Sequence, residues 1–434
     1  MEFYSTNDTT LRVNLKEAVL NSLPKDRGLY MPESILPLSE EFWHKFKEMS
    51  FPEIGYEVSR QLLKGSVEDT ELRQMTAKAL SFDAPVRSLG DGMHVLELFH
   101  GPTLAFKDFG ARFMAQIMSY LNREEDKPLT ILVATSGDTG GAVAAGFYKT
   151  PNIQVFILYP KGRVSPLQEK QLTTLGENIT AFEVDGSFDD CQAMVKQAFL
   201  DEELSTTFQL TSANSINITR LVPQSFYYFR AMQQLAMEGK KIVMCIPSGN
   251  FGNLTAGLLA KNLGLPIHHF IAATNINDIV PSYLHSGKYE PRASAATISN
   301  AMDVGNPSNF ARMKDLFGSS WEEMKGWISG YAFDDKETMG AIKEVYEKYN
   351  YTIDPHGAVG YLAAKTYQQD HPDEEVVILG TAHPSKFPGP VEEATGAAVE
   401  IPERLARLAE LPKEAHAIGT AFEAFKSMLM KMAK

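Results

Sequence analysis

The strongest pattern in the sequence is an alternation of short apolar runs with helical periodicities, which extends from about residue 94 to about residue 379. Buried strands separated by helices are typical of parallel sheets that helices cover on both faces. The sequence therefore predicts an α/β fold. The runs expected to form strands are 95–99, 130–134, 154–159, 179–184, 241–246, 269–273 and 375–379. The segments expected to form helices are 108–122, 139–148, 166–175, 188–200, 217–238, 252–263 and 357–369.

The region before this alternation has few strand signals and mostly helical spacing. Helices are expected near 9–23, 37–49, 53–64 and 68–80, and Ser39 followed by two glutamates is typical of a helix start. The pattern predicts a separate helical domain over 1–86, followed by an α/β region over 87–434. Within that region the stretch 285–335 is irregular, and a last helical run is expected over 401–433.

The composition excludes several classes of protein. The chain has 434 residues and a net charge of −13, and nucleic-acid phosphates require a basic face, so we expect no nucleic-acid partner. No apolar run approaches about 18 residues, so no membrane-spanning helix is expected. The first residues lack a basic segment followed by an apolar one, and Cys191 and Cys245 cannot form a disulfide framework. We therefore expect a cytoplasmic protein, and no spacing of ligating side chains indicates a metal.

Two glycine-rich turns each join a predicted strand to a predicted helix. One runs over Ala134–Gly141 and the other over Pro247–Asn253. Such turns direct backbone N–H groups and the positive end of a helix dipole to one place, which suits an anion. Neither turn matches the dinucleotide or the P-loop pattern. Each turn is therefore either an anion site or an ordinary tight connection between strand and helix.

A lysine lies where the helix predicted at 108–122 begins. Lys107 follows an apolar triplet, Leu104–Phe106. Apolar surroundings lower the pKa of an amine and make it available as a nucleophile, as a pyridoxal-phosphate enzyme requires. The alternative is a surface lysine paired with Asp108.

Considered together, these segments resemble the threonine synthase family of pyridoxal-phosphate enzymes, which have the tryptophan-synthase β-like fold (fold type II). The resemblance implies two open twisted sheets flanked by helices, a helical N-terminal domain over 1–86, and a catalytic region of two α/β lobes with a C-terminal helical extension over 87–434. It covers nearly the whole chain. The matching motifs are His100–Phe109, Ala134–Gly140, Ser212–Asn217, Pro247–Asn253, Asp354–Gly357 and Gly380–Pro384.

The resemblance also implies how pyridoxal 5′-phosphate is held. Lys107 forms the Schiff base and then transfers protons, and Thr381 bonds to the pyridine nitrogen. Asp138 departs from related enzymes, which often place an asparagine there to bond to the 3′-oxygen of the cofactor. An ionised aspartate cannot donate, so either Asp138 is protonated or a neighbouring group makes that contact. The residues expected around the cofactor phosphate are Ser248, Gly249, Asn250, Phe251, Gly252 and Asn253.

Substrate specificity is expected from a second phosphate site. By resemblance, the substrate is O-phospho-L-homoserine, and its phosphate contacts Asn214, Ser215, Asn217 and Arg220, with Thr135 and Ser136 nearby. Arg220 can offer two parallel N–H groups to a phosphate; the alternative for Arg220 is a surface ion pair.

The implied reaction yields L-threonine and phosphate, the last step of threonine biosynthesis, by a cytoplasmic monomer. Two other functions are considered. A serine or threonine dehydratase, or an O-acylserine β-replacement enzyme, would need no phosphate clamp. A non-catalytic ligand-binding homologue would have a damaged lysine or cofactor loop, whereas here both are present.

Overall fold

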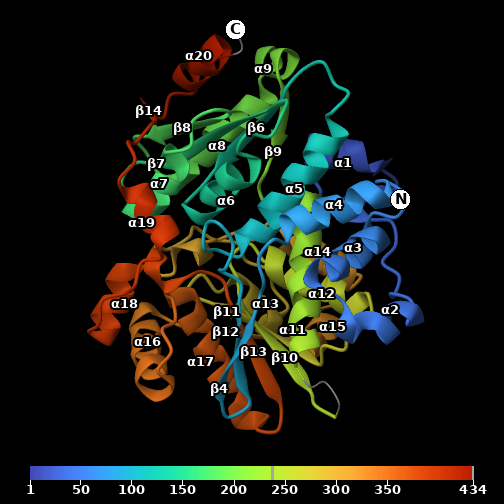
Figure 1. The fold of residues 1–434 in the computed structure, drawn as a ribbon, viewed down its shortest axis with the longest axis vertical. Coiled ribbons are helices and arrows are strands. Elements are labelled where there is room, and N and C mark those ends of the chain that lie inside the picture. Colours follow the sequence, from blue (N-terminus) through green and yellow to red (C-terminus); the bar gives the residue numbers. More distant parts are fainter. Residues whose placement is uncertain (236–238, 433–434) are drawn as a thin grey trace.

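Two sheets form the frame of the molecule (Figure 1). The computed structural model describes residues 1–235 and 239–432. The five-stranded sheet is parallel throughout and has the order β14-β8-β7-β6-β9. Its strands are β6 (Leu129–Ala134), β7 (Ile153–Pro160), β8 (Ile179–Val184), β9 (Gln209–Ser212) and β14 (His416–Ile418). This sheet confirms the parallel α/β arrangement that the sequence predicts for the strands at 130–134, 154–159 and 179–184.

The second sheet has six strands in the order β12-β11-β10-β13-β5-β4, and only the β4–β5 pair is antiparallel. Every residue of the central strand β10 is buried, which explains its unbroken apolar sequence. The strands are β4 (Val86–Gly90), β5 (Met93–Glu97), β10 (Ile242–Pro247), β11 (His269–Thr274), β12 (Ile328–Ala332) and β13 (Glu375–Gly380).

Helices follow the strands as the sequence predicts, with one exception. The helix predicted at 217–238 is divided into α10 (Ile218–Leu221), the 3₁₀ turn η2 (Val222–Ser225) and α11 (Phe226–Gln234), while 236–238 lie outside the described residues. Pro223 explains the division because proline lacks the N–H that continues a helix. The other helices in this part are α5 (Lys107–Leu121), α6 (Asp138–Phe147), α7 (Pro166–Thr173), α8 (Phe188–Leu200), α9 (Glu202–Thr207), α12 (Gly252–Asn262), α13 (Ile279–Ser286), α16 (Asp335–Tyr349) and α17 (Pro355–Asp370).

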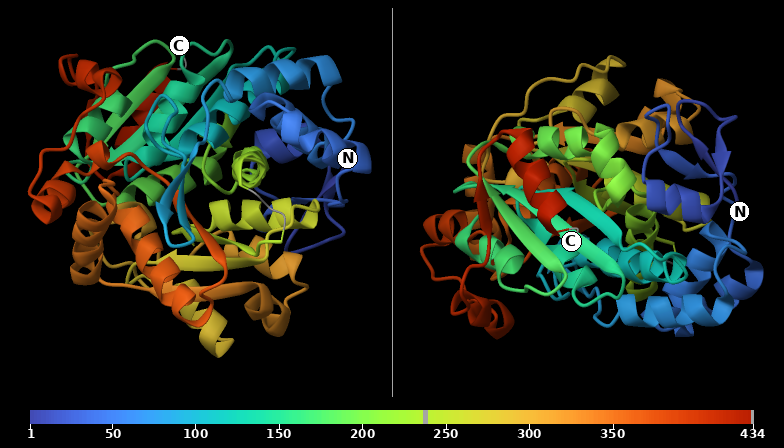
Figure 2. Two further views of the ribbon diagram at one scale, coloured as in Figure 1. Left: turned by 60° about the horizontal axis from the view of Figure 1, so that its bottom comes forward. Right: turned by 90° about the horizontal axis from the view of Figure 1, so that it is seen from above.

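The N-terminal segment contains more than the predicted helices. Its helices are α1 (Leu15–Asn21), α2 (Glu40–Lys45), α3 (Phe51–Leu62) and α4 (Asp69–Ala79), with the 3₁₀ turn η1 (Phe46–Glu48) after α2. A three-stranded antiparallel sheet of β1 (Phe3–Ser5), β2 (Arg12–Val13) and β3 (Tyr30–Pro32) accompanies them and is not predicted. The segment lies at one side of the molecule, where α3 contacts α11 and α4 contacts α5 (Figure 2). The boundary at residues 86 and 87 stays a prediction.

The C-terminal segment connects the two lobes. The sequence predicts a single helical run at 401–433, but the structure has two helices, α19 (Glu403–Ala409) and α20 (Phe422–Met432), with β14 between them. Pro412 and Gly419 lie in the segments that separate these elements. Residue 433 lies outside the described part. Before them come η4 (Pro384–Lys386) and α18 (Pro388–Thr395). α18 packs on α16 of one lobe, whereas α19 contacts α7 and β14 extends the other sheet beside β8 (Figure 1).

The stretch predicted as irregular, 285–335, contains the end of α13, η3 (Asn300–Met302), α14 (Phe310–Leu316), α15 (Trp321–Trp327) and β12. Among the described helices, none is long and apolar enough to cross a bilayer.

Candidate active site

The carboxyl ends of neighbouring strands bring the predicted site residues together. β10, β13 and β5 lie side by side, so Ser248 after β10, Thr381 after β13 and the segment that follows β5 meet at one edge. Two backbone hydrogen bonds connect the last two: the Phe106 N–H donates to the Thr381 carbonyl at 2.9 Å, and the His383 N–H donates to the Leu104 carbonyl at 3.0 Å. Thr381 is therefore a backbone neighbour of the segment that ends in Lys107.

Lys107 is the first residue of α5, as predicted, and it is half-buried. Burial lowers the pKa of Lys107 to about 8, with Arg220 and Lys386 acting in the same direction and Asp138 opposing them. Asp108 does not pair with it, because the Asp108 carboxylate accepts hydrogen bonds from the backbone N–H of Thr103 at 2.8 Å and from its hydroxyl at 2.7 Å. The surface-pair alternative for Lys107 is therefore wrong.

Asp138, at the start of α6, forms a buried ion pair that the sequence does not predict. The Lys386 Nζ lies 2.6 Å from its Oδ1, and the Gln168 amide donates to the same oxygen at 2.9 Å. Burial alone would raise the pKa of Asp138, but the charges of Lys386 and Lys107 and the two hydrogen bonds lower it well below its usual range. Of the two alternatives for Asp138, the protonated form is therefore disfavoured.

The turn after β10 is shaped to receive an anion at the first residues of α12. Phe251 has the left-handed φ of 58°, a strained conformation that is common at binding sites. The Ser248 hydroxyl donates to the Asn253 side-chain oxygen at 2.6 Å, and the Asn253 amide donates to the Pro247 carbonyl at 2.8 Å, so both side chains brace the turn. The first N–H groups of a helix have no intrahelical partner and remain available for a phosphate.

A glycine makes this turn possible. A Cβ atom at Gly249 would lie 2.7 Å from the Ala301 carbonyl oxygen and 2.9 Å from the Met302 Cα, both backbone atoms. We expect Gly249→Ala to displace the turn at a cost of about 1–3 kcal/mol and to weaken pyridoxal-phosphate binding roughly ten- to a hundredfold. Titration of the apoenzyme with the cofactor measures this. Gly326→Ala is the matched control because nothing lies within 4 Å of its Cβ position; equal affinities for both variants would contradict the role of Gly249.

Arg220 is a buried cation without a carboxylate partner among the described residues. Its Nη1 donates to the Ala213 carbonyl at 2.6 Å, while its Nε has no hydrogen-bond partner. Burial lowers its pKa to about 10. The neighbouring Asn214 also has a buried, unpartnered side-chain oxygen. The surface ion-pair alternative for Arg220 is therefore wrong, and the arrangement favours an anionic ligand.

The other predicted substrate residues differ in how free their side chains are. Asn217 caps α10: its Oδ1 accepts from Thr219, and its amide donates to the Val19 carbonyl at 2.8 Å and to the Ser22 hydroxyl at 2.9 Å. The Thr135 hydroxyl accepts from the Gly137 and Gly140 N–H groups. Both side chains thus hold backbone in place. Ser136 and Ser215 are half-buried.

Arg312, which the sequence analysis did not select, supports the turn at Ser215. It is fully buried, and its guanidinium donates to the carbonyls of Tyr30, Ser215 and Ile216 and to the Asn309 side chain. Asn309 in turn has a buried Nδ2 near Gly252 of the cofactor turn, and this atom has no hydrogen-bond partner among the residues that the structure describes. No motif spacing could reveal Arg312, because its acceptors are backbone carbonyls distant in sequence.

We expect Arg312→Met to lower the free energy of unfolding by about 3 kcal/mol or more, because several buried carbonyls would lose their donors at about 1–3 kcal/mol each. Denaturant unfolding measures this change. A loss below about 1 kcal/mol would contradict the structural role of Arg312.

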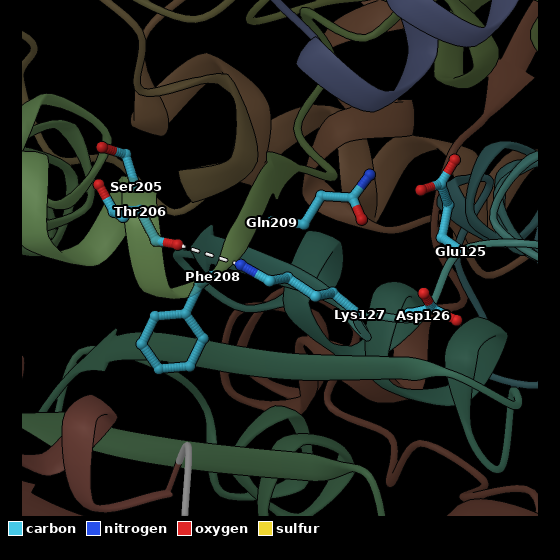
Figure 3. A pocket seen from close by; sticks show the side chains of 7 residues that line it. All are labelled: Glu125, Asp126, Lys127, Ser205, Thr206, Phe208 and Gln209. Atoms are coloured by element: carbon cyan, nitrogen blue, oxygen red, sulfur yellow. Dashed lines mark hydrogen bonds between the residues drawn. The ribbon is translucent and has the colours of Figure 1, made fainter.

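Figure 3 shows a surface pocket whose lining includes none of the site residues described above. It is near the amino ends of β6 and β9, whereas ligands of parallel α/β sheets bind beyond the carboxyl ends. Lys127 donates across it to the Thr206 carbonyl at 3.3 Å. Its lining residues are Glu125, Asp126, Lys127, Ser205, Thr206, Phe208 and Gln209.

A half-buried lysine of lowered pKa and a strained turn before a helix N-terminus lie at the carboxyl ends of neighbouring strands of one sheet. These features fit pyridoxal phosphate, and comparisons with known proteins agree. The family model "Pyridoxal-phosphate dependent enzyme" matches residues 78–381. The chain is therefore a pyridoxal-phosphate-dependent enzyme of the α/β type. Two further models, "Threonine synthase N terminus" and "Threonine synthase, C-terminal", match residues 2–80 and 357–429.

Relatives of known activity identify the family. The threonine synthase of Escherichia coli strain K12 is 46% identical over 431 residues, which cover 99% of each chain, and that of Schizosaccharomyces pombe is 34% identical over 89% of this chain and 88% of its own. The crystal structure of threonine synthase from Escherichia coli superposes with a TM-score of 0.92 at 45% identity and full coverage of both chains. The pyridoxal-phosphate-bound threonine synthase from Brucella melitensis superposes with a TM-score of 0.93 at 33% identity, also with full coverage. This chain belongs to the threonine synthase family.

Proposed function

We propose that this chain converts O-phospho-L-homoserine and water into L-threonine and phosphate, and that the residues assembled above perform the reaction. The observation that carries this proposal is Arg220. The Arg220 guanidinium is buried, has no carboxylate partner within residues 1–235 and 239–432, and interacts electrostatically with Lys107, so it is suited to a second anion beside the cofactor. A serine or threonine dehydratase, or an O-acylserine β-replacement enzyme, acts on a substrate without a phosphate and would not require this second anion site.

The residues present fit pyridoxal 5′-phosphate. Ser248–Asn253 would hold its phosphate through the first N–H groups of α12, Lys107 would bind its aldehyde carbon, and Thr381 would bond to its ring nitrogen. Asp138 would flank the ring as a carboxylate, paired with Lys386. When bound, the cofactor supplies an electron sink that permits removal of protons from the carbon atoms of the amino acid.

Lys107 is the acid and base of this proposal. With a pKa of about 8, an appreciable fraction of its amine is neutral near pH 7 and can accept the α proton of the substrate, and the resulting ammonium can return a proton. Its place at the start of α5 keeps Lys107 close to Thr381, and so close to the cofactor ring whose nitrogen Thr381 would bond.

Arg220, with Asn214 and Ser215, would bind the γ-phosphate and stabilise the charge that grows on it as its bond to carbon breaks. Thr135 and Ser136 would border this site, and Asn217 would hold the Asn214–Ser215 turn through its bonds to Val19 and Ser22. The phosphate leaves from Cγ as Cβ loses a proton. Cγ then takes up a proton to become the methyl group, water supplies the hydroxyl group at Cβ, and Cα regains its proton, which completes threonine.

We further propose a cytoplasmic monomer in which residues 1–86 form the N-terminal domain and residues 87–434 the catalytic region. Buried, unpaired Cys191 and Cys245 agree with a reducing compartment. The monomeric state rests on family resemblance alone, and gel filtration with light scattering tests it.

Product analysis tests the proposed reaction. Incubation with O-phospho-L-homoserine and pyridoxal phosphate should release threonine and phosphate in equal amounts. Phosphate with a keto acid in place of threonine would identify an eliminating enzyme of the same fold, and no product from a cofactor-loaded protein would overturn the proposal.

A further inference from the structure

A second lysine lies beside Lys107, and the proposed reaction does not use it. Lys386, in η4, is fully buried and donates to Asp138 Oδ1 at 2.6 Å and to the Thr103 carbonyl at 2.9 Å. A fully buried ion pair loses the hydration of both charges and is a poor source of stability. Asp138 is the first residue of α6, and Thr103 lies in the segment before Lys107, the first residue of α5. This position of the pair points to a role in the active site.

The charges around Lys107 come from several elements. Asp138 on α6 is the anion that acts on it, and Arg220 on α10 and Lys386 on η4 are the cations. Asp138 itself is faced by Lys386, Lys107 and the neutral Gln168 of α7. Asp108 on α5 is separately bound by Thr103 and faces the charges of Lys386, Arg112, Arg220 and Arg404.

We propose that Lys386 is a positioning residue that binds the Asp138 carboxylate and so prevents Asp138 from forming an ion pair with Lys107. The positive charge of Lys386 offsets the negative charge of Asp138 near Lys107, and this balance sets how tightly Lys107 holds its proton. This inference rests on the proposed role of Lys107 in binding the cofactor. It also accounts for an aspartate where related enzymes often have an asparagine, since the aspartate here has its own cation.

Removing either member of the Lys386–Asp138 pair should change the proton affinity of Lys107, and the two changes should have opposite signs. Lys386→Met leaves a buried carboxylate whose nearest remaining cation is Lys107, so the proton affinity of Lys107 should rise. Asp138→Asn removes the anion and leaves the positive charges of Lys386 and Arg220, so the proton affinity should fall. Each change should be about tenfold or more, because unit charges in a partly desolvated site interact strongly.

The rate at which the apoenzyme takes up pyridoxal phosphate measures this affinity. The neutral Lys107 amine attacks the aldehyde and water is lost, so the initial rate, followed by visible absorbance, should rise with pH to half its maximum near pH 8 in the wild type. The midpoint should move up by about one pH unit or more in Lys386→Met and down in Asp138→Asn. Lys386→Arg should stay near the wild type because it preserves the cation.

Two controls separate the possible failures. Lys365→Met removes an exposed lysine that pairs with Glu344 at 2.6 Å, and it should leave the midpoint unchanged. Lys107→Ala should take up no cofactor covalently; if it does, the proposed function fails at its central residue. If Lys107 is confirmed but the two variants shift the midpoint together or not at all, the inference about Lys386 is wrong even if both lose stability. If Lys386→Met does not fold, the Asp138→Asn and Lys386→Arg midpoints decide the question.

Discussion

Lys107→Ala is expected to lower kcat for O-phospho-L-homoserine by at least about 10⁴-fold, the upper end of what a single acid–base group contributes, because this amine both binds the cofactor and moves protons. Product assays and absorbance of the loaded protein measure the two losses separately. Lys365→Ala is the surface control and should retain full activity, since Lys365 is exposed on α17.

Turnover of the Lys107→Ala variant within about tenfold of the wild type would remove Lys107 from the mechanism, even if the reaction itself were confirmed. Added primary amines offer a further check: partial recovery of activity would show that the missing group is the amine and not a packing contact.

Arg220→Met is expected to lower kcat/KM for O-phospho-L-homoserine about 10²–10³-fold, the usual effect of removing one group that stabilises developing negative charge. Stability should fall by no more than about 1 kcal/mol. In the part of the chain that the structure describes, the substitution removes a buried charge that has no carboxylate partner and breaks only the bond to Ala213. Steady-state kinetics and denaturant unfolding measure both quantities.

Arg312→Met is the matched control for Arg220, since it also removes a buried guanidinium. The donors of Arg312 all bind groups of the protein, so its loss should appear mainly in stability. If Arg220→Met lost stability as Arg312→Met does and kept its kcat/KM, the phosphate site would lie elsewhere.

The sequence predicts the central part of the fold well because its strands are buried on both faces. Every residue of β6 and β10 is buried and nearly all are apolar, and the bounds of both strands differ from prediction by one residue at most. In the two large sheets four strands were not predicted, β4, β9, β12 and β14, and these are the edges of those sheets. Edge strands are short and half-solvated, so their sequences lack the apolar signal: β9 reads Gln-Leu-Thr-Ser.

The candidate site could be predicted where chemistry depends on local sequence. The start of α5 at Lys107 and the turn before α12 follow from a few adjacent residues. Lys386 could not be assigned in this way, because its importance comes from a contact with Asp138, which is distant in sequence. The same holds for Asn217, whose bonds to Val19 and Ser22 depend on the packing of α1 against β9.

A crystal structure with pyridoxal phosphate and a non-hydrolysable phosphonate analogue of O-phospho-L-homoserine tests the central claim, that two anion sites lie on either side of Lys107. We predict the cofactor phosphate on the N–H groups at the start of α12, and the phosphonate within hydrogen-bond distance of the Arg220 guanidinium and Asn214. A phosphonate bound away from Arg220, with that guanidinium still without an anionic partner, would contradict the account.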